Sequence, residues 1–438
     1  MSRIQEDTYL GGSPREREPD NAPVGSQTKT YDVIALFSGG LDSILAVKVL
    51  AAQGLKVKAL HFFTPFFGKP QARKYWGKLY NLDLTAIDVG DEFVEMMKTG
   101  PGSGFGKVLN PCVDCKILIL RRARALLARY GATFLATGEV MGQRPMSQRR
   151  DTLNRISREA DVRDCLLRPL SAKLLPPTPM EEDGRVNREL LCGIWGRGRK
   201  AQFKLAKSFG ITEIPTPAGG CRLAEMENAR RYWPVFKYLP SCTAADFYLA
   251  NFGRQFWAGR HWLSVGRNAA DNEALEKLVQ PGDFVFKTLD FPGPLSLGRP
   301  VPGADWDEAV QVSAAALAAS FSPKARQNSE PVRVRITQGQ EAREVTLDSP
   351  QEAAKDAAAL WRALTWNEVK PEIHALRQKP AQGIHKDAPG EQTPPKEAYS
   401  QNTDARATEA RPPIGQNSEI PIAAESPSPA GSGRQGQA

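Results

Sequence analysis

FSGGLDS, at residues 37–43, follows an apolar run over 33–37 and precedes a helical pattern over 41–53. Two glycines let the backbone turn tightly and approach a phosphate closely, and the free N–H groups at the start of a helix point toward an anion. Ser38 and Ser43 add hydroxyl donors. The alternative is a plain Gly-Gly turn with a helix cap. The complete string between a strand and a helix favours a loop that holds a pyrophosphate.

Asp42 adds a carboxylate to this loop. A carboxylate would repel a bare phosphate, so we expect Asp42 to hold a Mg²⁺ ion that bridges the phosphates. The loop lacks the Gly-Lys-Ser/Thr ending of a Walker A motif, which disfavours transfer of the γ-phosphate.

Apolar runs and helical spacing alternate along the first half of the chain. Strands are expected at 33–37, 57–63, 83–89 and 133–136, and helices at 41–53, 71–80, 91–98 and 113–130. This alternation is typical of a parallel sheet with crossover helices. The predicted fold class for residues 31–225 is α/β, a doubly wound parallel sheet whose ligand lies beyond the carboxyl ends of the strands.

The second half of the chain has shorter apolar runs, divided by Gly and Pro. We predict a smaller α+β domain over 226–325, with an extension over 326–376. Residues 1–30 and 377–438 contain too few apolar side chains to offset the entropy of ordering, so disordered tails are expected there.

The 438 residues include 58 Lys and Arg against 49 Asp and Glu, a net charge of +9, which favours a polyanionic partner. No apolar run reaches the roughly 18 residues that a membrane-spanning helix needs. A soluble, cytoplasmic protein that does not bind a membrane is the expectation.

The S-G-G-x-D-S string in its strand-loop-helix context resembles the PP-loop ATP pyrophosphatases, a family with a HUP-like fold that cleaves ATP to AMP and pyrophosphate. The resemblance implies that ATP and Mg²⁺ bind and that a substrate is adenylated. It assigns ATP binding to a set of loop residues: Ser38, Gly39, Gly40, Asp42 and Ser43. Within that family, residues 31–225 resemble the tRNA thiolation enzymes, namely the 4-thiouridine synthetase and the 2-thiouridylases.

ATGEVMGQRPMSQ, at residues 136–148, resembles the T-G-x-x-x-G-Q-x-x-S-Q stretch of the 4-thiouridine synthetase. The resemblance places it at the nucleotide cleft, where Thr137 and Gly138 contact the adenylate and Gln143 orients a phosphate or a base. The alternative is a polar loop with a capping serine.

NPCVDCK, at residues 110–116, precedes a long helical pattern, whose positive end would lower the pKa of a thiol. The segment resembles the N-P-C-x-x-C of the 2-thiouridylases, in which a cysteine works with a distant second one, and Cys221 is the matching candidate. Two mechanisms stay open. Either Cys112 or Cys221 carries a persulfide that the other resolves, or Cys112, Cys115 and Cys221 hold a [4Fe–4S] cluster. A structural zinc and inert buried thiols are the alternatives, and the four histidines show no ligand spacing.

Residues 197–207 place five cations in eleven positions without an acid. Such a run suits a phosphate backbone or a solvated helix face. The string over 262–272 resembles the RNA-binding NFACT-R domain, which implies an RNA-binding role for the second domain. The candidate RNA-binding residues of both regions are Arg197, Arg199, Lys200, Lys204, Arg267, Asn268 and Lys287.

The predicted function is an ATP-dependent tRNA sulfurtransferase that adenylates a uridine or another base and replaces its carbonyl oxygen with sulfur. Asp42, Cys112 and Cys221 are the candidate catalytic residues. Roughly thirty residues precede the first domain, too few for an N-terminal tRNA-binding module, and no sulfur-carrier domain follows the second, so sulfur is expected from a separate donor. The alternatives are a PP-loop amidotransferase or ligase, and a non-catalytic RNA-binding protein with a relict nucleotide fold.

Overall fold

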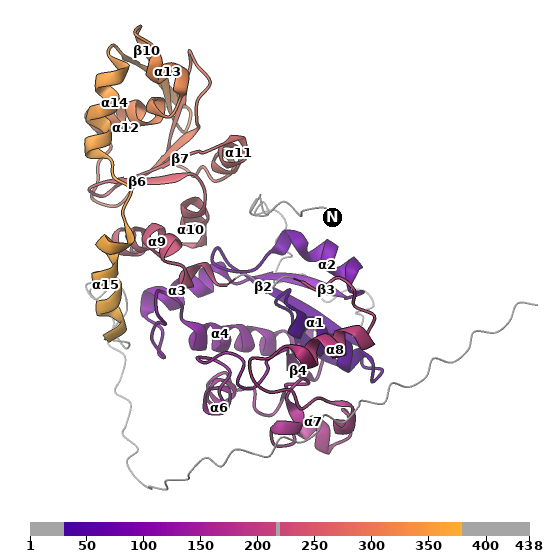
Figure 1. Cartoon of the computed structure of the whole chain (residues 1–438). Coiled ribbons are helices and arrows are strands. Elements are labelled where there is room, and N and C mark those ends of the chain that lie inside the picture. The colour runs from indigo at the N-terminus through magenta and orange to yellow at the C-terminus, as the bar shows by residue number, and fades with distance from the viewer. Residues whose placement is uncertain (1–29, 216–219, 379–438) are drawn as a thin grey trace, which may run out of the picture.

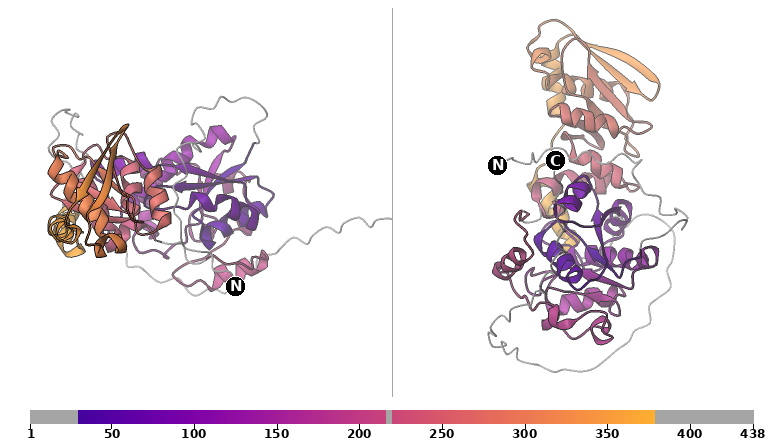
Figure 2. Two further views of the ribbon diagram at one scale, coloured as in Figure 1. Left: turned by 90° about the horizontal axis from the view of Figure 1, so that it is seen from above. Right: turned by 90° about the vertical axis from the view of Figure 1, so that its right-hand side faces the viewer.

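The computed structural model describes residues 30–215 and 220–378. Two β-sheets lie at opposite ends of an elongated molecule, with helices between them (Figure 1). The right-hand view of Figure 2 shows the same two lobes after a quarter turn. None of the described helices is long and apolar enough to cross a bilayer. The predicted tails lie outside the described residues, except that residue 30 is described and residues 377 and 378 end the last helix.

The first sheet is parallel, and its five strands run in the order β3-β2-β1-β4-β5. The strands are β1 (Val33–Leu36), β2 (Val57–Phe63), β3 (Leu84–Asp88), β4 (Phe134–Thr137) and β5 (Leu166–Leu167). The central strand β1 pairs with β2 from Val33↔Val57 and with β4 from Val33↔Phe134. All four of its residues are buried, as a strand covered on both faces requires. The doubly wound parallel sheet predicted from the sequence is confirmed.

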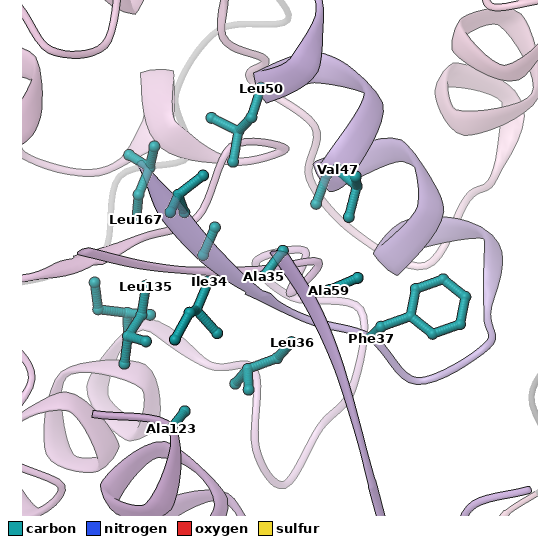
Figure 3. Close-up of a cluster of buried hydrophobic side chains, with 14 of the residues drawn as sticks. Ile34, Ala35, Leu36, Phe37, Val47, Leu50, Ala59, Ala123, Leu135 and Leu167 are labelled. Carbon is teal, nitrogen blue, oxygen red and sulfur yellow. The ribbon is translucent and has the colours of Figure 1, made fainter. Parts of the chain in front are cut away.

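Helices cover both faces of this sheet. They are α1 (Leu41–Ala51), α2 (Arg73–Leu79), α3 (Gly90–Thr99), α4 (Cys112–Ala125), α5 (Leu127–Tyr130), α6 (Arg150–Glu159), α7 (Pro179–Glu182) and α8 (Lys200–Ser208), with 3₁₀ turns at Pro70–Ala72, Ala172–Leu174, Arg188–Leu190 and Arg222–Ala224. Figure 3 shows Val47 and Leu50 of α1 on one side of β1 and Ala123 of α4 on the other. The helix expected over 113–130 is interrupted at Leu126, where α4 gives way to α5.

A helical layer joins the two sheets. It consists of α9 (Met226–Tyr238), α10 (Ala244–Asn251) and α15 (Trp366–Gln378), which pack with α3 of the first domain. Its centre is aromatic: Phe66 lies 5.1 Å from Tyr232 and 5.0 Å from Phe247, measured between ring centroids. The residues that follow the predicted boundary at 225/226 therefore share a core with the first domain.

The second sheet is antiparallel, with its six strands in the order β11-β10-β8-β9-β7-β6. The strands are β6 (Arg254–Ala258), β7 (His261–Val265), β8 (Phe284–Thr288), β9 (Ser296–Arg299), β10 (Val332–Gln338) and β11 (Glu341–Leu347), and the helices are α11 (Ala269–Lys277), α12 (Glu308–Ser320), α13 (Pro323–Gln327) and α14 (Pro350–Leu360). Because β10 lies between β8 and β11, the sheet continues well past residue 325.

Candidate active site at the carboxyl edge of the parallel sheet

The glycine-rich loop between β1 and α1 is held by its own hydrogen bonds. Gly39 has a φ of 82°, a conformation that favours glycine, and an added Cβ would lie 2.8 Å from the Trp76 ring. The Ser43 hydroxyl donates to the Gly40 carbonyl at 2.7 Å and accepts from the Ser38 amide at 3.2 Å. The loop is therefore shaped before any ligand binds.

His61 of β2 contacts the backbone at the start of the loop. Its Nδ1 lies 2.9 Å from the Phe37 carbonyl, and the Lys69 amide donates to its Nε2 at 2.8 Å. Since Nε2 accepts, Nδ1 carries the proton and the ring is neutral. Burial lowers the pKa of His61, against the opposing effect of the Phe37 carbonyl, which agrees with the neutral form. The sequence offered no role for this histidine, because its two partners are backbone groups distant in the chain.

Asp42 and Gln143 meet across the mouth of this loop. Gln143 Nε2 donates to Asp42 Oδ2 at 3.0 Å, which joins the two segments expected at the nucleotide cleft. The second oxygen of Asp42 and the side-chain oxygens of Gln143 and Gln148 are buried and lack a partner in the part of the chain that the structure describes. Most buried polar atoms in proteins are hydrogen-bonded. A ligand bound at this loop would complete these oxygens, and a Mg²⁺ ion is one that fits the Asp42 carboxylate.

The end of β4 touches the start of α1. A Cβ on Gly138 would lie 2.5 Å from the Asp42 carbonyl oxygen, so no side chain fits there. Thr137 is buried, and its hydroxyl donates to Glu139 Oε2 at 3.1 Å. Gly138 therefore sits against the predicted nucleotide loop, whereas the Thr137 side chain is engaged within the protein.

Glu139 is a buried carboxylate between two cations. Arg168 Nε donates to it at 3.0 Å, and Lys116 Nζ lies 3.7 Å away. Burial on its own would raise the pKa of Glu139, but Lys116 and Arg168 outweigh burial and the pKa is lowered. Lys116 directly follows Cys115 on α4, so the ion pair ties the cysteine helix to the segment that contacts Asp42. Sequence reasoning missed Glu139 and Arg168, because only folding brings them together.

The segment that begins at Cys221 lies beside the start of α4, although more than a hundred residues separate Cys221 from Cys112. The Leu109 amide donates to the Leu223 carbonyl at 3.0 Å, and the Arg222 amide donates to the Phe66 carbonyl at 2.9 Å. Phe66 follows the carboxyl end of β2, so the cysteines lie at the same edge of the sheet as the nucleotide loop.

The thiols of this group influence one another. Burial, followed by the charges of Cys221 and Cys112, raises the pKa of Cys115, and burial raises the pKa of Cys221 to about 12. The position of the CxxC pair at the start of a helix predicted a lowered thiol pKa. For Cys115 this prediction is wrong, because desolvation outweighs the effect of the helix. The Asn110 side-chain amide donates to Cys112 Sγ at 3.1 Å and orients that sulfur.

An iron–sulfur cluster on Cys112, Cys115 and Cys221 stays a prediction. Among residues 30–215 and 220–378, no group of three or more His, Cys, Asp or Glu side chains is arranged to hold a metal ion. We therefore derive no step through a cluster. Cys165, Cys192 and Cys242 are buried in the hydrophobic cores, as expected for cysteines without a site.

The predicted RNA-binding residues of the first domain lie at and before α8. Arg197, Lys200 and Lys204 are exposed. Arg199 is partly buried, and its guanidinium lies 5.3 Å from the Phe203 ring centroid. Helix α8 packs beside α1, so this basic segment belongs to the nucleotide-binding lobe (Figure 1).

The predicted RNA-binding residues of the second domain lie in the other lobe and differ from one another. Arg267 Nε forms a 2.5 Å ion pair with Asp271, and the Asn268 side chain caps α11 by accepting from the Asp271 amide at 2.9 Å. Lys287 of β8 is exposed and has no ion-pair partner among the described residues. The structure does not bring these residues together with the α8 segment.

Two family models match this chain. Residues 28–173 match a model described as Thiamine biosynthesis protein (ThiI), and residues 253–361 match one described as NFACT protein RNA binding domain. Both resemblances drawn from the motifs are thereby confirmed, the first over a shorter range than 31–225 and the second with later limits than 226–325.

Several curated relatives are tRNA sulfurtransferases by name. The chain is 28% identical over 148 residues to a probable tRNA sulfurtransferase of Thermococcus kodakarensis. The aligned residues cover 32% of this chain and 36% of the relative. It is 29% identical over 175 residues to the tRNA sulfurtransferase of Pectobacterium atrosepticum, covering 38% of this chain and 34% of the relative. The chain thus spans about a third of the length of these relatives.

Among solved structures, a predicted subunit of a tRNA methyltransferase from Methanocaldococcus jannaschii aligns with a TM-score of 0.24 and 18% identity, over 32% of this chain and 68% of that one. The C-terminal part of a fibronectin/fibrinogen-binding protein from Streptococcus suis aligns with a TM-score of 0.20 and 17% identity. That alignment covers 36% of this chain and 78% of the other.

Proposed function

We propose that this protein is an ATP-dependent tRNA sulfurtransferase. The observation that carries the proposal is the placement of Asp42, with a buried oxygen that lacks a partner in the described chain, at the same sheet edge as Cys112 and Cys221. A ligase that used ammonia or an amine would need no pair of cysteines at this edge. The tRNA sulfurtransferase names of the relatives support the same substrate class.

In the first step the glycine-rich loop binds the phosphates of ATP. Gly39 and Gly40 offer backbone N–H groups at the start of α1, while the Ser43 hydroxyl, which donates to the Gly40 carbonyl, holds the loop in shape. Asp42 would hold a Mg²⁺ ion, which would neutralise phosphate charge. The carbonyl oxygen of the base attacks the α-phosphate, and pyrophosphate leaves. The base is then adenylated, and its carbon is open to attack by sulfur.

In the second step one cysteine of the Cys112 and Cys221 pair carries a persulfide delivered by a separate sulfur donor. Its terminal sulfur attacks the adenylated carbon, and AMP leaves with the former carbonyl oxygen. The thiolate of the other cysteine attacks the cysteine sulfur of the resulting disulfide, which releases the thiolated base and forms a disulfide between Cys112 and Cys221. An external dithiol reductant returns both cysteines to thiols.

A two-part assay separates these steps. Protein is incubated with ATP, Mg²⁺, total tRNA and a protein persulfide donor, and both pyrophosphate release and thionucleosides in the digested tRNA are measured. We expect Asp42→Asn to lower pyrophosphate release by about a hundredfold, in the range seen when one charge-stabilising group is removed. Cys112→Ser and Cys221→Ser should retain pyrophosphate release and form no thionucleoside, and Cys192→Ser is the buried control.

Two outcomes would contradict the proposal. Full tRNA modification by Cys112→Ser and Cys221→Ser with an amine donor would indicate an amidotransferase or ligase. Failure of the wild-type protein to bind ATP, measured by calorimetry, would indicate a non-catalytic RNA-binding protein.

A further inference from the structure

Trp195 is 68% exposed, more than any other large hydrophobic residue in the described part of the chain. A tryptophan so exposed loses the favourable burial of a large apolar ring. It lies outside both ranges that match family models, 28–173 and 253–361. The exposed ring is therefore a feature of this chain that the family matches leave unexplained.

The backbone around Trp195 is fixed. Trp195 forms a parallel bridge with Met141, the Gly196 amide donates to the Met141 carbonyl at 2.8 Å, and the Ile194 amide donates to the Leu170 carbonyl at 2.8 Å. The indole also packs on Gly142, where an added Cβ would lie 3.0 Å from Nε1. The backbone that carries the ring is thus held in place before any partner arrives, which lowers the entropy cost of binding.

This position is next to the reaction centre of the proposed mechanism. Gly142 directly precedes Gln143, whose side chain donates to Asp42 at 3.0 Å. The segment that supports Trp195 is therefore the same one that reaches the nucleotide loop. A base that stacks on this indole would therefore contact the segment that reaches the nucleotide loop.

Cations and a second aromatic ring follow Trp195 along the chain. Arg197 and Lys200 are exposed, and Phe203 is 44% exposed with the Arg199 guanidinium over its ring. Arg199 Nε and both polar atoms of the Gln202 side chain are buried and unpartnered within the described residues. Aromatic rings interleaved with cations are the composition by which proteins hold single-stranded nucleic acid.

We propose that Trp195 stacks on an unpaired base of the RNA substrate, while Arg197 and Lys200 contact the phosphates that flank it. The inference rests on the proposed function, because it names how the RNA enters the site of ATP-dependent thiolation. A base within a duplex offers no free face, so the site takes single-stranded RNA or a base displaced from a helix.

Fluorescence anisotropy with a labelled single-stranded oligoribonucleotide of about eight residues tests the inference. We expect Trp195→Ala to weaken binding by about tenfold, within the range for loss of one stacked base, and Trp195→Phe to retain most of the affinity. Tyr75→Ala, which removes an exposed ring on α2, is the matched control and should bind as the wild type does. A duplex of equal length should bind the wild type and Trp195→Ala alike.

The outcomes separate the inference from the proposed function. Wild-type binding that Trp195→Ala leaves unchanged overturns the stacking role and leaves RNA thiolation intact. A loss of ATP affinity without a loss of RNA affinity in Trp195→Ala assigns the ring to adenine and also overturns the inference. If the wild type binds neither oligonucleotide nor tRNA, the RNA substrate itself is wrong and both proposals fail.

Discussion

The nucleotide loop at the carboxyl edge of the parallel sheet and the ion-pair network around Arg299 in the antiparallel domain differ in how their buried charged groups are partnered. At the first, Asp42 and Gln143 keep oxygens without a partner in the described chain. In the second, Arg299 is fully engaged: it bonds Asp246 at 3.0 Å, Asp283 at 2.8 Å and the Leu278 carbonyl at 2.8 Å.

This difference separates a site from a scaffold. An unpartnered buried polar group costs about 1–3 kcal/mol, and a ligand bound at the nucleotide loop would offset that cost. A satisfied network instead fixes the packing of the elements that it joins, here β9, α10 and the turn before β8. The cations of the second domain that can reach RNA are therefore the exposed ones.

The largest effect is expected from breaking the satisfied network. Arg299→Met should lower the free energy of unfolding by about 3–5 kcal/mol, because it leaves two buried carboxylates without their cation. Urea denaturation measures the change. Arg254→Met, which removes an exposed guanidinium of β6 with no acidic partner among the described residues, is the control. A change under about 1 kcal/mol for Arg299→Met would show that the network does not fix the scaffold.

The partly buried thiol of Cys221 should react slowly because desolvation raises its pKa. Burial raises the pKa of Cys221 from 9.0 to about 12, so at pH 8 its alkylation by iodoacetamide should be about a hundredfold to a thousandfold slower than that of a free thiol, and should accelerate as pH rises toward 12. The same shift contributes stability below pH 9 that is lost as pH rises. Peptide mass spectrometry follows the reaction. In urea all six cysteines should react alike, and equal rates in the folded protein would contradict burial of this thiol.

A side chain at the contact between β4 and α1 should damage both folding and ATP binding. Gly138→Ala places a Cβ 2.5 Å from the Asp42 carbonyl oxygen, and we expect a loss of about 1–3 kcal/mol in stability with weaker ATP binding. Thermal unfolding and calorimetry measure the two effects. Gly198→Ala is the control, since no atom lies within 4 Å of its added Cβ. If the two variants had equal stability and equal ATP affinity, Gly138 would not lie as close to Asp42 as described.

The smallest effects are expected at the surface of the second domain, where two cations should behave differently. Lys287→Gln should leave stability unchanged and lower the slope of log affinity for RNA against log salt concentration by about one. Arg267→Gln should cost about 0.5–1 kcal/mol in stability, because it breaks a half-exposed ion pair with Asp271. If instead Arg267→Gln lowered the salt slope of RNA binding and Lys287→Gln lowered stability, the RNA contact would lie at Arg267. The distinction between paired and exposed cations would then be wrong.

Much of the first domain could be predicted from the sequence. Strands β1 to β4 and helices α1 to α3 lie within a few residues of the predicted positions, because each has a strong local apolar pattern. The single helix predicted over 113–130 is divided into α4 and α5. The short strand β5 was not predicted, since its two residues form a strand only by pairing with β4. In the second domain Asn268 also caps a helix, a local role that the sequence analysis did not assign, and its predicted contact with RNA stays a prediction.

The sequence by itself determined the parallel sheet, the position of the nucleotide loop and the presence of Asp42 in it, because backbone turns and strand-to-helix order depend on neighbouring residues. Only the tertiary structure decided that Cys221 lies near Cys112 and that burial raises the pKa of Cys221. It also decided that Glu139 joins Lys116 to Arg168. The exposure of Trp195 is likewise a result of the tertiary structure. Proximity between distant residues and access to water are properties of packing, and packing is set by the whole chain.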